Sequence, residues 1–233
     1  MPALKPADFT ALYANFATPI TALDCGQKCA PYNEYGVPFC CDTGHAIPTA
    51  YEAEWDYLQP NTDLWHLWES DDPTETEELR AETPEGQLLI ECLGHQHCQR
   101  NFRSITCRAF PFFPYLTRAG EFIGLSVYWR YEDRCWVISH LDAVTPAYVR
   151  QFVAAYEQIF THIPGERENF RYHAIIMRRI FGRQKRSIPL LHRDGKVYTV
   201  RPKDGALTPV DPAALPKFGD YAIAAAMLFP DEA

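Results

Sequence analysis

The stretch that decides the character of this chain reads Glu91-Cys92-Leu93-Gly94-His95-Gln96-His97-Cys98 and continues to Cys107-Arg108-Ala109-Phe110-Pro111-Phe112. It holds three of the eight cysteines of the chain. The other five are Cys25, Cys29, Cys40, Cys41 and Cys135. Outside oxidising compartments, clustered cysteines more often bind metal or take part in catalysis than form disulfides. The sequence therefore predicts that the N-terminal part gathers thiolates around metal.

Length and composition describe an ordinary globular protein. The chain has 233 residues, of which 47% are hydrophobic and 14% aromatic, and a chain of this size buries roughly 70% of its unfolded surface without staples. The first residues, Met1-Pro2-Ala3-Leu4-Lys5, do not resemble a signal peptide, and no apolar run is long enough to span a membrane. We therefore expect a cytosolic protein that does not interact with membranes.

The net charge of -8 is unevenly spread. Seven acids and one base lie between residues 71 and 85, a run with two prolines that is typical of an exposed linker. Eleven bases and three acids lie between residues 165 and 203. A solvated helix face explains this basic run better than an anionic partner does, so we do not expect nucleic acid to bind.

Periodicity predicts a mixed α+β fold. Helices are expected at residues 7–16, at 50–59 with Thr49 as cap and Glu52 completing a capping box, at 146–162 after Thr145-Pro146, and at 166–181 before Gly182. A last helix is expected from residue 211 to 229, with a break near Pro216.

Strands are expected at residues 87–91, and hairpins at 112–117 with 122–131 and at 188–193 with 196–200, the second turning at Asp194-Gly195. A further strand at 135–139 would make the first hairpin a small antiparallel meander. The full expectation is one compact domain with an irregular cysteine-rich metal-binding core in residues 1–140. A helical and hairpin portion, residues 141–233, would pack on it.

The cysteine spacing is C-x3-C-x10-C-C-x50-C-x5-C-x8-C-x27-C. It lacks the C-x2-C knuckle common in structural zinc sites. Cys25 and Cys29 would share one face if their segment is helical. Cys40 and Cys41 on an extended backbone would point to opposite sides, and so would serve two sites more readily than one.

Iron-sulfur clusters accept ligands from separate loops, and nearby aromatic residues such as Phe110, Phe112 and Trp136 would supply either a dry shell or plain core. His95 and His97 could complete a mixed Cys/His site. Arg108 could hydrogen-bond a cluster sulfide or an anion, or pair with an acid. These three residues are possible members of a second shell.

The doublet Cys40-Cys41, the segment after Ile47-Pro48-Thr49, and Cys92-x5-Cys98-x8-Cys107-Arg108-x-Phe110-Pro111-Phe112 together resemble the YkgJ-like cysteine-cluster family. The resemblance covers residues 25–140. It implies about eight cysteines that chelate zinc or iron. The family is distantly similar to flagellin lysine N-methylase, which implies that an iron-sulfur centre can accompany methyl transfer, but we recognise no substrate-binding residues for that reaction here.

The leading hypothesis is an iron-sulfur protein, with a [4Fe-4S] cluster held by cysteine and a redox or enzymatic role toward an unidentified redox partner or substrate. The candidate ligands are Cys25, Cys29, Cys40, Cys41, Cys92, Cys98, Cys107 and Cys135. The alternative is a zinc-stabilised binding module with one or two four-cysteine sites and no catalytic activity. A third hypothesis is a disulfide-stapled secreted protein. The sequence contains no phosphate-binding glycine loop, dinucleotide fingerprint, H-E-x-x-H or G-x-S-x-G.

Overall fold

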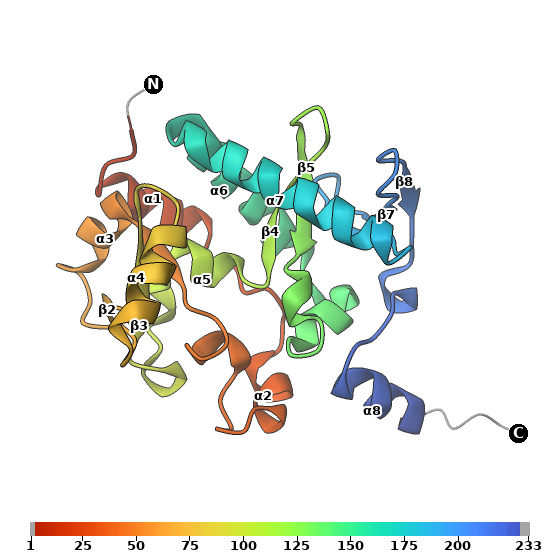
Figure 1. Ribbon diagram of the computed structural model, residues 1–233, viewed down its shortest axis with the longest axis horizontal. Helices are drawn as coiled ribbons and strands as arrows, with labels where there is room; N and C mark the ends of the chain where they lie inside the picture. Colours follow the sequence, from red (N-terminus) through yellow and green to blue (C-terminus); the bar gives the residue numbers. More distant parts are fainter. Residues whose placement is uncertain (1–2, 229–233) are drawn as a thin grey trace, which may run out of the picture.

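The computed structural model describes residues 3–228, and within them the protein has a mixed α+β fold with two antiparallel sheets (Figure 1). One sheet has three strands in the order β1-β3-β2, and the other has five in the order β4-β5-β6-β7-β8. The predicted α+β class is confirmed. In Figure 1 the small sheet lies on the left with α1, α3 and α4, the larger sheet lies at the centre and right, and α7 runs from the upper left across it.

The first helix, α1 (Asp8–Asn15), forms where the sequence predicts it. Phe9, Leu12 and Tyr13 recur at helical spacing, and all three are buried. The apolar face thus fixes α1 against the core.

The small sheet contains β1 (Thr49–Tyr51), β2 (Trp65–Leu67) and the central strand β3 (Gln87–Cys92). Strand β3 confirms the prediction for residues 87–91. The helix predicted from residue 50 starts later, as α3 (Glu52–Leu58), so Thr49 is not its cap. Thr49 is instead paired with Leu89 across the sheet, and Glu54 in place of Glu52 accepts a hydrogen bond from the Tyr51 backbone N–H at 3.3 Å.

The acidic run is a helix and not a linker, which corrects the prediction. Helix α4 (Pro73–Glu82) begins after Asp72, whose side chain accepts a hydrogen bond from the Thr74 backbone N–H at 2.9 Å. A cap, a proline at the first helical position and an acid in the first turn all favour helix initiation. The run of like charge hid these start signals.

The five-stranded sheet contains β4 (Phe112–Leu116), β5 (Phe122–Val127), β6 (Ile188–His192), β7 (Val197–Val200) and β8 (Leu207–Pro209). Both predicted hairpins are confirmed by the pairing of β4 with β5 and of β6 with β7. Strand β8 was not predicted.

The strand predicted at residues 135–139 is wrong, because Trp136–Ser139 forms the 3-10 helix η6. Strand β6 takes the place beside β5. Gly124, with φ of +154°, makes this pairing possible, since a Cβ atom there would lie 2.3 Å from the Leu191 carbonyl oxygen.

Helices α6 (Pro146–His162) and α7 (Pro164–Arg183) separate β5 from β6 in the chain and pack on the large sheet and on each other (Figure 1). The predicted start of α6 is confirmed, with the Thr145 hydroxyl accepting from the Tyr148 backbone N–H at 3.2 Å. Helix α7 continues through Gly182, where the sequence predicts its end. It stops just before Lys185, whose φ is +56°.

The last predicted helix is divided. The 3-10 helix η8 (Pro212–Ala214) and α8 (Asp220–Leu228) are separate, and Phe229 lies outside the described residues. The remaining short helices surround the cysteines or connect to α6. They are α2 (Gly26–Cys29), η1 (Ala30–Tyr32), η2 (Phe39–Cys41), η3 (His95–His97), η4 (Arg100–Phe102), α5 (Ile105–Ala109), η5 (Trp129–Tyr131) and η7 (Leu141–Ala143).

One connected cluster of buried side chains contains Phe9, Phe113, Phe152 and Phe181, so residues before and after position 140 share a core. Burying one such phenylalanine stabilises the fold by roughly 1.5–3 kcal/mol. A smaller cluster of Cys29, Phe39 and Tyr221 lies apart from it. No helix in residues 3–228 is long and apolar enough to cross a membrane.

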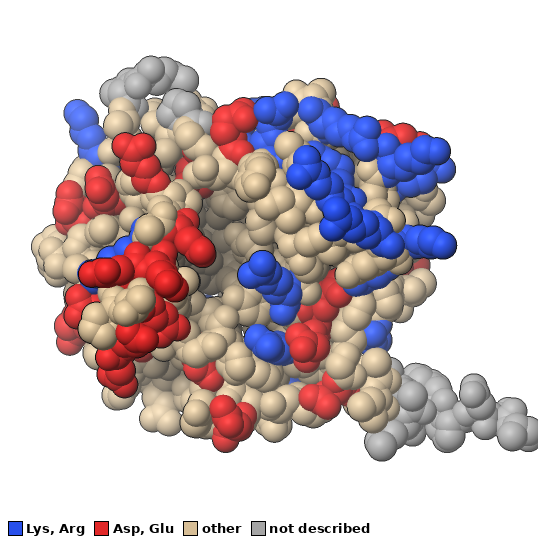
Figure 2. Space-filling model, in the orientation of Figure 1, with Lys and Arg blue, Asp and Glu red and all other residues tan. Residues whose placement is uncertain are grey.

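Acidic side chains gather on one side of the molecule and basic side chains over α7 (Figure 2). Part of the basic run stabilises the fold. Arg178 is buried and donates to the Leu116 carbonyl at 2.8 Å, and Arg186 pairs with Glu132 at 2.7 Å.

Candidate metal centre

All eight cysteines line one cavity of about 470 Å³. They reach it from α2, from η2, from the end of β3, from α5, and from the turns after η3 and before η6. All eight are free thiols. The structure therefore brings together every residue that the sequence proposes as a thiolate ligand, although Cys25 and Cys135 are separated by 110 positions.

The segment of Cys25 and Cys29 is helical. Cys25 has φ -64° and ψ -24° and leads into α2, which ends at Cys29. One helical turn separates the two residues, so both side chains border the cavity. The face-sharing that the sequence analysis made conditional on a helix is thus present.

The doublet corrects a premise of the sequence analysis. Cys40 and Cys41 lie in the 3-10 helix η2 and not on an extended backbone. Pro38 begins this turn, and its carbonyl accepts the Cys41 backbone N–H at 2.8 Å. Successive side chains of a 3-10 helix are about 120° apart, which lets both sulfurs face one cavity, 3.9 Å from each other.

The central stretch places its three thiols through a strand end, a turn and a capped helix. Cys92 is the last residue of β3 and is paired with Trp65. Gly94, at φ +90°, turns the chain toward Cys98. Cys107 lies in α5, where its backbone N–H donates to the Ser104 hydroxyl at 3.2 Å. Ser104 therefore fixes the first turn of α5 and with it the position of Cys107.

Arg103 is the charged residue that sequence reasoning missed. Its Nε donates to the Cys98 sulfur at 3.1 Å. Burial lowers the pKa of Arg103. Negative charge on Cys107, Cys98 and Cys41 raises it by a larger amount in total, so the net pKa is above its usual range. The available signal was its position between Cys98 and Cys107, within the same stretch.

Arg108, which the sequence analysis placed beside a cluster or an acid, occupies a different position. Its guanidinium donates to the carbonyls of Phe16 at 2.6 Å, Asn101 at 2.7 Å and Arg103 at 2.8 Å. It also lies 4.3 Å from the centre of the Tyr13 ring. Arg108 is not among the residues that line the cysteine cavity, and it joins the end of α1 to the turn before α5.

The candidate histidines do not all lie at the cysteine cavity. His95 lines the cysteine cavity, whereas His97 is exposed at the end of η3 and does not line it. His45 borders a second cavity, and its backbone carbonyl accepts the Tyr131 hydroxyl at 2.8 Å. Of the three, His95 is the one placed to supplement the thiols.

The thiols are held in a site that disfavours their charged form. Burial raises the pKa of Cys107 and of Cys135 to about 12, and repulsion from neighbouring thiolates adds to the effect. The pKa of Cys41 is lowered because the Cys40 thiol donates to it. Arg100 and Arg103 are the lysine or arginine residues among the described lining. A full set of thiolates here needs additional positive charge.

The eight cysteine side chains line the wall of the cavity and are not grouped around a single position. Among residues 3–228, no three His, Cys, Asp or Glu side chains lie close enough together to hold a single metal ion. Tetrahedral zinc with Zn–S bonds of about 2.3 Å requires sulfurs roughly 3.8 Å apart. Cys40 and Cys41 meet that spacing, but a tetrahedral site needs four ligands and these two residues supply two.

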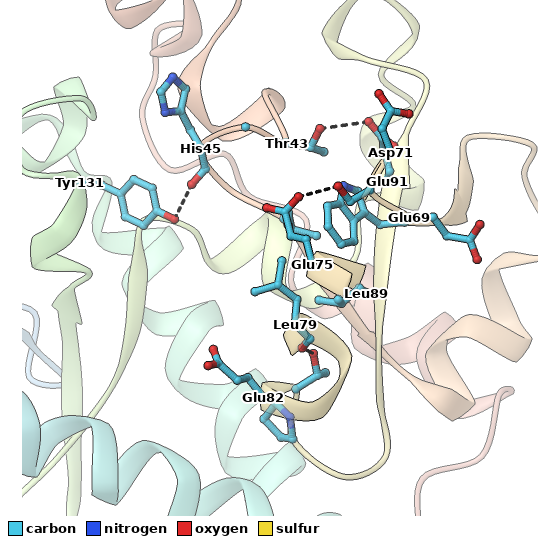
Figure 3. A pocket seen from close by; sticks show the side chains of 16 residues that line it. Thr43, His45, Glu69, Asp71, Glu75, Leu79, Glu82, Leu89, Glu91 and Tyr131 are labelled. Carbon is cyan, nitrogen blue, oxygen red and sulfur yellow. Dashed lines mark hydrogen bonds between the residues drawn. The ribbon is translucent and has the colours of Figure 1, made fainter. Parts of the chain in front are cut away.

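A second cavity, of about 710 Å³, shares lining residues with the first, and Figure 3 shows the side chains that line it. We call it the acidic groove because its lining includes Glu69, Asp71, Glu75, Glu82 and Glu91. Thr43 and Glu91 line both cavities, and the Thr43 hydroxyl donates to Glu91 at 3.2 Å. These two residues form a shared wall.

Comparison with protein-family models, with curated proteins and with solved structures finds no match to this chain.

Proposed function

We propose that this chain is an iron-sulfur protein that holds its metal in the cysteine cavity and acts in electron transfer or as the redox-active part of an enzyme. The observation that carries the proposal is that all eight cysteines, from segments far apart in the sequence, line the same cavity. The resemblance to the YkgJ-like family, for which no family-model match was found, implies the same assignment.

The shape of the donor set favours a polynuclear cluster over separate single ions. A cluster places several metal atoms between its ligands, so its cysteine sulfurs stand farther apart than those around one zinc ion. The cavity of about 470 Å³ between the thiols leaves room for such a core.

The charge balance of the site fits a cationic core. Burial and mutual repulsion keep the pKa of Cys107 and Cys135 high, and binding of iron replaces the thiol protons. In this proposal the eight cysteines supply thiolate ligands, and Arg103 donates a hydrogen bond to a ligand sulfur. The bound cluster would supply reversible one-electron chemistry.

The apolar part of the lining would keep water from the metal. Trp65, Phe39, Phe110 and Trp136 all border the cavity. Burial and hydrogen bonds to sulfur are the main means by which a protein sets the potential of a cluster. In this proposal these side chains would form the dry shell that the sequence analysis considered for Phe110 and Trp136.

The test is the content of iron and acid-labile sulfide, with a visible spectrum, in protein purified without oxygen. We expect iron and sulfide in about equal amounts and a broad brown absorption that bleaches on reduction. A variant with all eight cysteines changed to alanine should be colourless. Zinc without sulfide or colour would overturn the proposal and leave the zinc-stabilised binding module.

A further inference from the structure

We propose that residues 217–221 form a clasp that covers Cys29 from outside the cysteine cavity and opens before metal or a thiol reagent reaches this side of the site. The inference rests on the proposed function, because it assigns control of access to the same proposed metal centre. We call these residues the C-terminal clasp.

The chain runs along the surface after β7 and buries one side chain there. In Figure 1 it descends from β8 to α8. Among residues 201–224, whose burial the structure describes, Tyr221 is the one that is buried, with 4% of its surface exposed. Leu215 and Phe218 are half-buried, and Ile223 is 56% exposed. Tyr221 is therefore the main anchor of this part of the chain.

Tyr221 is buried against a wall of the cysteine cavity. It forms a small cluster with Cys29 and Phe39, against which Trp136 packs. These three neighbours line the cavity, whereas Tyr221 is not in the described lining and so lies behind them. Cys29 is 6% exposed. The Tyr221 ring therefore covers Cys29 on the side away from the cavity.

Hydrogen bonds join the clasp to the segment that carries Cys135. The Tyr221 hydroxyl donates to the Arg134 carbonyl at 2.6 Å. The Phe218 backbone N–H donates to the Ser139 hydroxyl at 2.9 Å. Because residues 134 and 139 flank Cys135, the two bonds hold the clasp across the turn that places this thiol.

Gly219 lets the clasp approach this turn closely. Its φ is +54°, a conformation that favours glycine. A Cβ atom at this position would lie 2.8 Å from the Asp133 carbonyl oxygen. A side chain at position 219 would therefore push the clasp away from the turn.

The clasp also contacts the segment between Cys29 and the cysteine doublet. The rings of Tyr32 and Tyr221 meet edge to face, with their centroids 5.4 Å apart. Tyr221 thus touches the segment of Cys29 and bonds to the segment of Cys135, which are far apart in the sequence. Its release would uncover both parts of the cavity wall together.

The clasp can open without unfolding of the protein. Regions with few buried contacts open locally at lower free energy than the core does. The clasp has one buried side chain, whereas every residue of β4 and β5 is buried. Opening would therefore expose Cys29 while the five-stranded sheet stays folded.

The first experiment measures the rate at which iodoacetamide alkylates each cysteine in reduced, full-length protein, by mass spectrometry of its peptides. Tyr221→Ala should raise the rate at Cys29, relative to that at Cys92, by about tenfold. Tyr221→Phe keeps the ring and loses the bond to the Arg134 carbonyl, so its effect should be smaller. Ile223→Ala, on the exposed side of α8, should match wild type.

Two glycine variants form a matched pair. Gly219 and Gly205 both have positive φ, but a Cβ atom at position 205 would meet nothing within 4 Å. Gly219→Ala should therefore speed alkylation of Cys29, and Gly205→Ala should not. Wild-type rates at Cys29 in both Tyr221→Ala and Gly219→Ala would overturn the clasp. An equal rise at Cys29 and Cys92 would also overturn it, because it would show a loss of stability in the whole fold.

A second measurement needs no variant. In hydrogen exchange of the wild-type protein, the amides of Phe218 and Tyr221 should exchange by local opening, well before those of β5. Exchange of all of them only on global unfolding would overturn the inference.

Metal provides the last test. In iron-loaded protein, Tyr221→Ala should lose iron to a chelator faster than Ile223→Ala does, and equal rates would overturn the control of access. A protein that binds no iron would instead overturn the proposed function. Alkylation and hydrogen exchange would still decide whether the clasp covers Cys29, so the two failures are distinct.

Discussion

The cysteine cavity and the acidic groove share a wall but place their negative groups in different ways. The carboxylates of the groove come mostly from residues 69–91, and Glu75 and Glu82 are exposed on α4. Water solvates such groups, so they tolerate one another without a cation. The thiols come from distant segments, and burial raises the pKa of most of them. If the cysteines bind metal as proposed, its charge would compensate the buried thiolates of the first cavity, whereas water already solvates the carboxylates of the second.

Removal of the proposed metal from the loaded protein tests this difference most strongly. Because bound metal stabilises the folded state and offsets repulsion among thiolates, its removal with a chelator should cost several kcal/mol. For a chain of this length that corresponds to a fall in melting temperature of roughly 10 °C or more, measurable by circular dichroism. Glu82→Gln protein, altered in the acidic groove alone, should show the same fall. Identical melting curves with and without metal would contradict the expected dependence.

The next largest effect concerns Glu54, a carboxylate that is fully buried, unlike those of the groove. It accepts the Tyr13 hydroxyl at 2.6 Å and the Ile105 backbone N–H at 2.7 Å, and so joins α1 and α3 to the start of α5. Burial raises its pKa from 4.5 to about 7. The folded state therefore holds the proton more tightly than the unfolded state does.

This contribution to stability is fully present below pH 4.5 and is lost as the pH rises through about 7. Over that range the wild-type free energy of unfolding should fall by about 3 kcal/mol relative to that of Glu54→Gln. Urea unfolding of both proteins across this range provides the measurement. Glu82→Gln is the matched control, since it removes an exposed charge and should follow the wild-type curve. Parallel curves for wild type and Glu54→Gln would show that Glu54 does not titrate in this way.

Replacement of Arg103 sharpens the contrast within the cysteine cavity. A unit charge about 8 Å from a metal centre interacts with it by ~2 kcal/mol at an effective dielectric constant of about 20, which equals roughly 90 mV for one electron. Arg103→Gln should lower the reduction potential of the proposed cluster by an amount of this order. Arg100→Gln is the control, because Arg100 also lines the cavity but is exposed and lies 3.8 Å from Asp24. Equal shifts in the two variants would remove the special role of Arg103.

The smallest expected effect is at the shared wall. Thr43→Val removes the hydrogen bond to Glu91 with little change in shape, and such a bond contributes about 1 kcal/mol. The melting temperature should fall by about 2–4 °C, while the iron content should stay at the wild-type level. Thr10→Val, on the exposed face of α1, should leave both unchanged. Loss of iron in Thr43→Val would show that the wall supports the metal centre.

Local signals in the sequence predicted much of the secondary structure. Thr145-Pro146 starts α6, and Asp194-Gly195 turns between β6 and β7, because capping and turn formation depend on a few neighbouring residues. The strand predicted at residues 135–139 is wrong for the opposite reason. Strand pairing requires a partner, and the edge of β5 that this segment would need is occupied by β6, more than fifty residues later in the chain.

For the candidate site, too, some features follow from the local sequence and others only from the packing of distant segments. The residue type and spacing of the cysteines predicted a thiolate-rich site, and the helical spacing of Cys25 and Cys29 is a local property of α2. The meeting of all eight thiols in one cavity depends on how α2, η2, β3, α5 and the turn before η6 pack together. The pattern could name the candidate ligands but not show that they meet.

The sequence by itself determined the fold class, the starts of α1 and α6, both hairpins and the identity of the thiols. The tertiary structure alone decided which arginine faces them. Arg103 and Arg108 are five positions apart, yet Arg103 reaches the Cys98 sulfur and Arg108 reaches the Phe16 carbonyl, 92 positions away in the chain. A buried guanidinium must satisfy its donors, and the acceptors within its reach are set by segments that the local sequence does not contain.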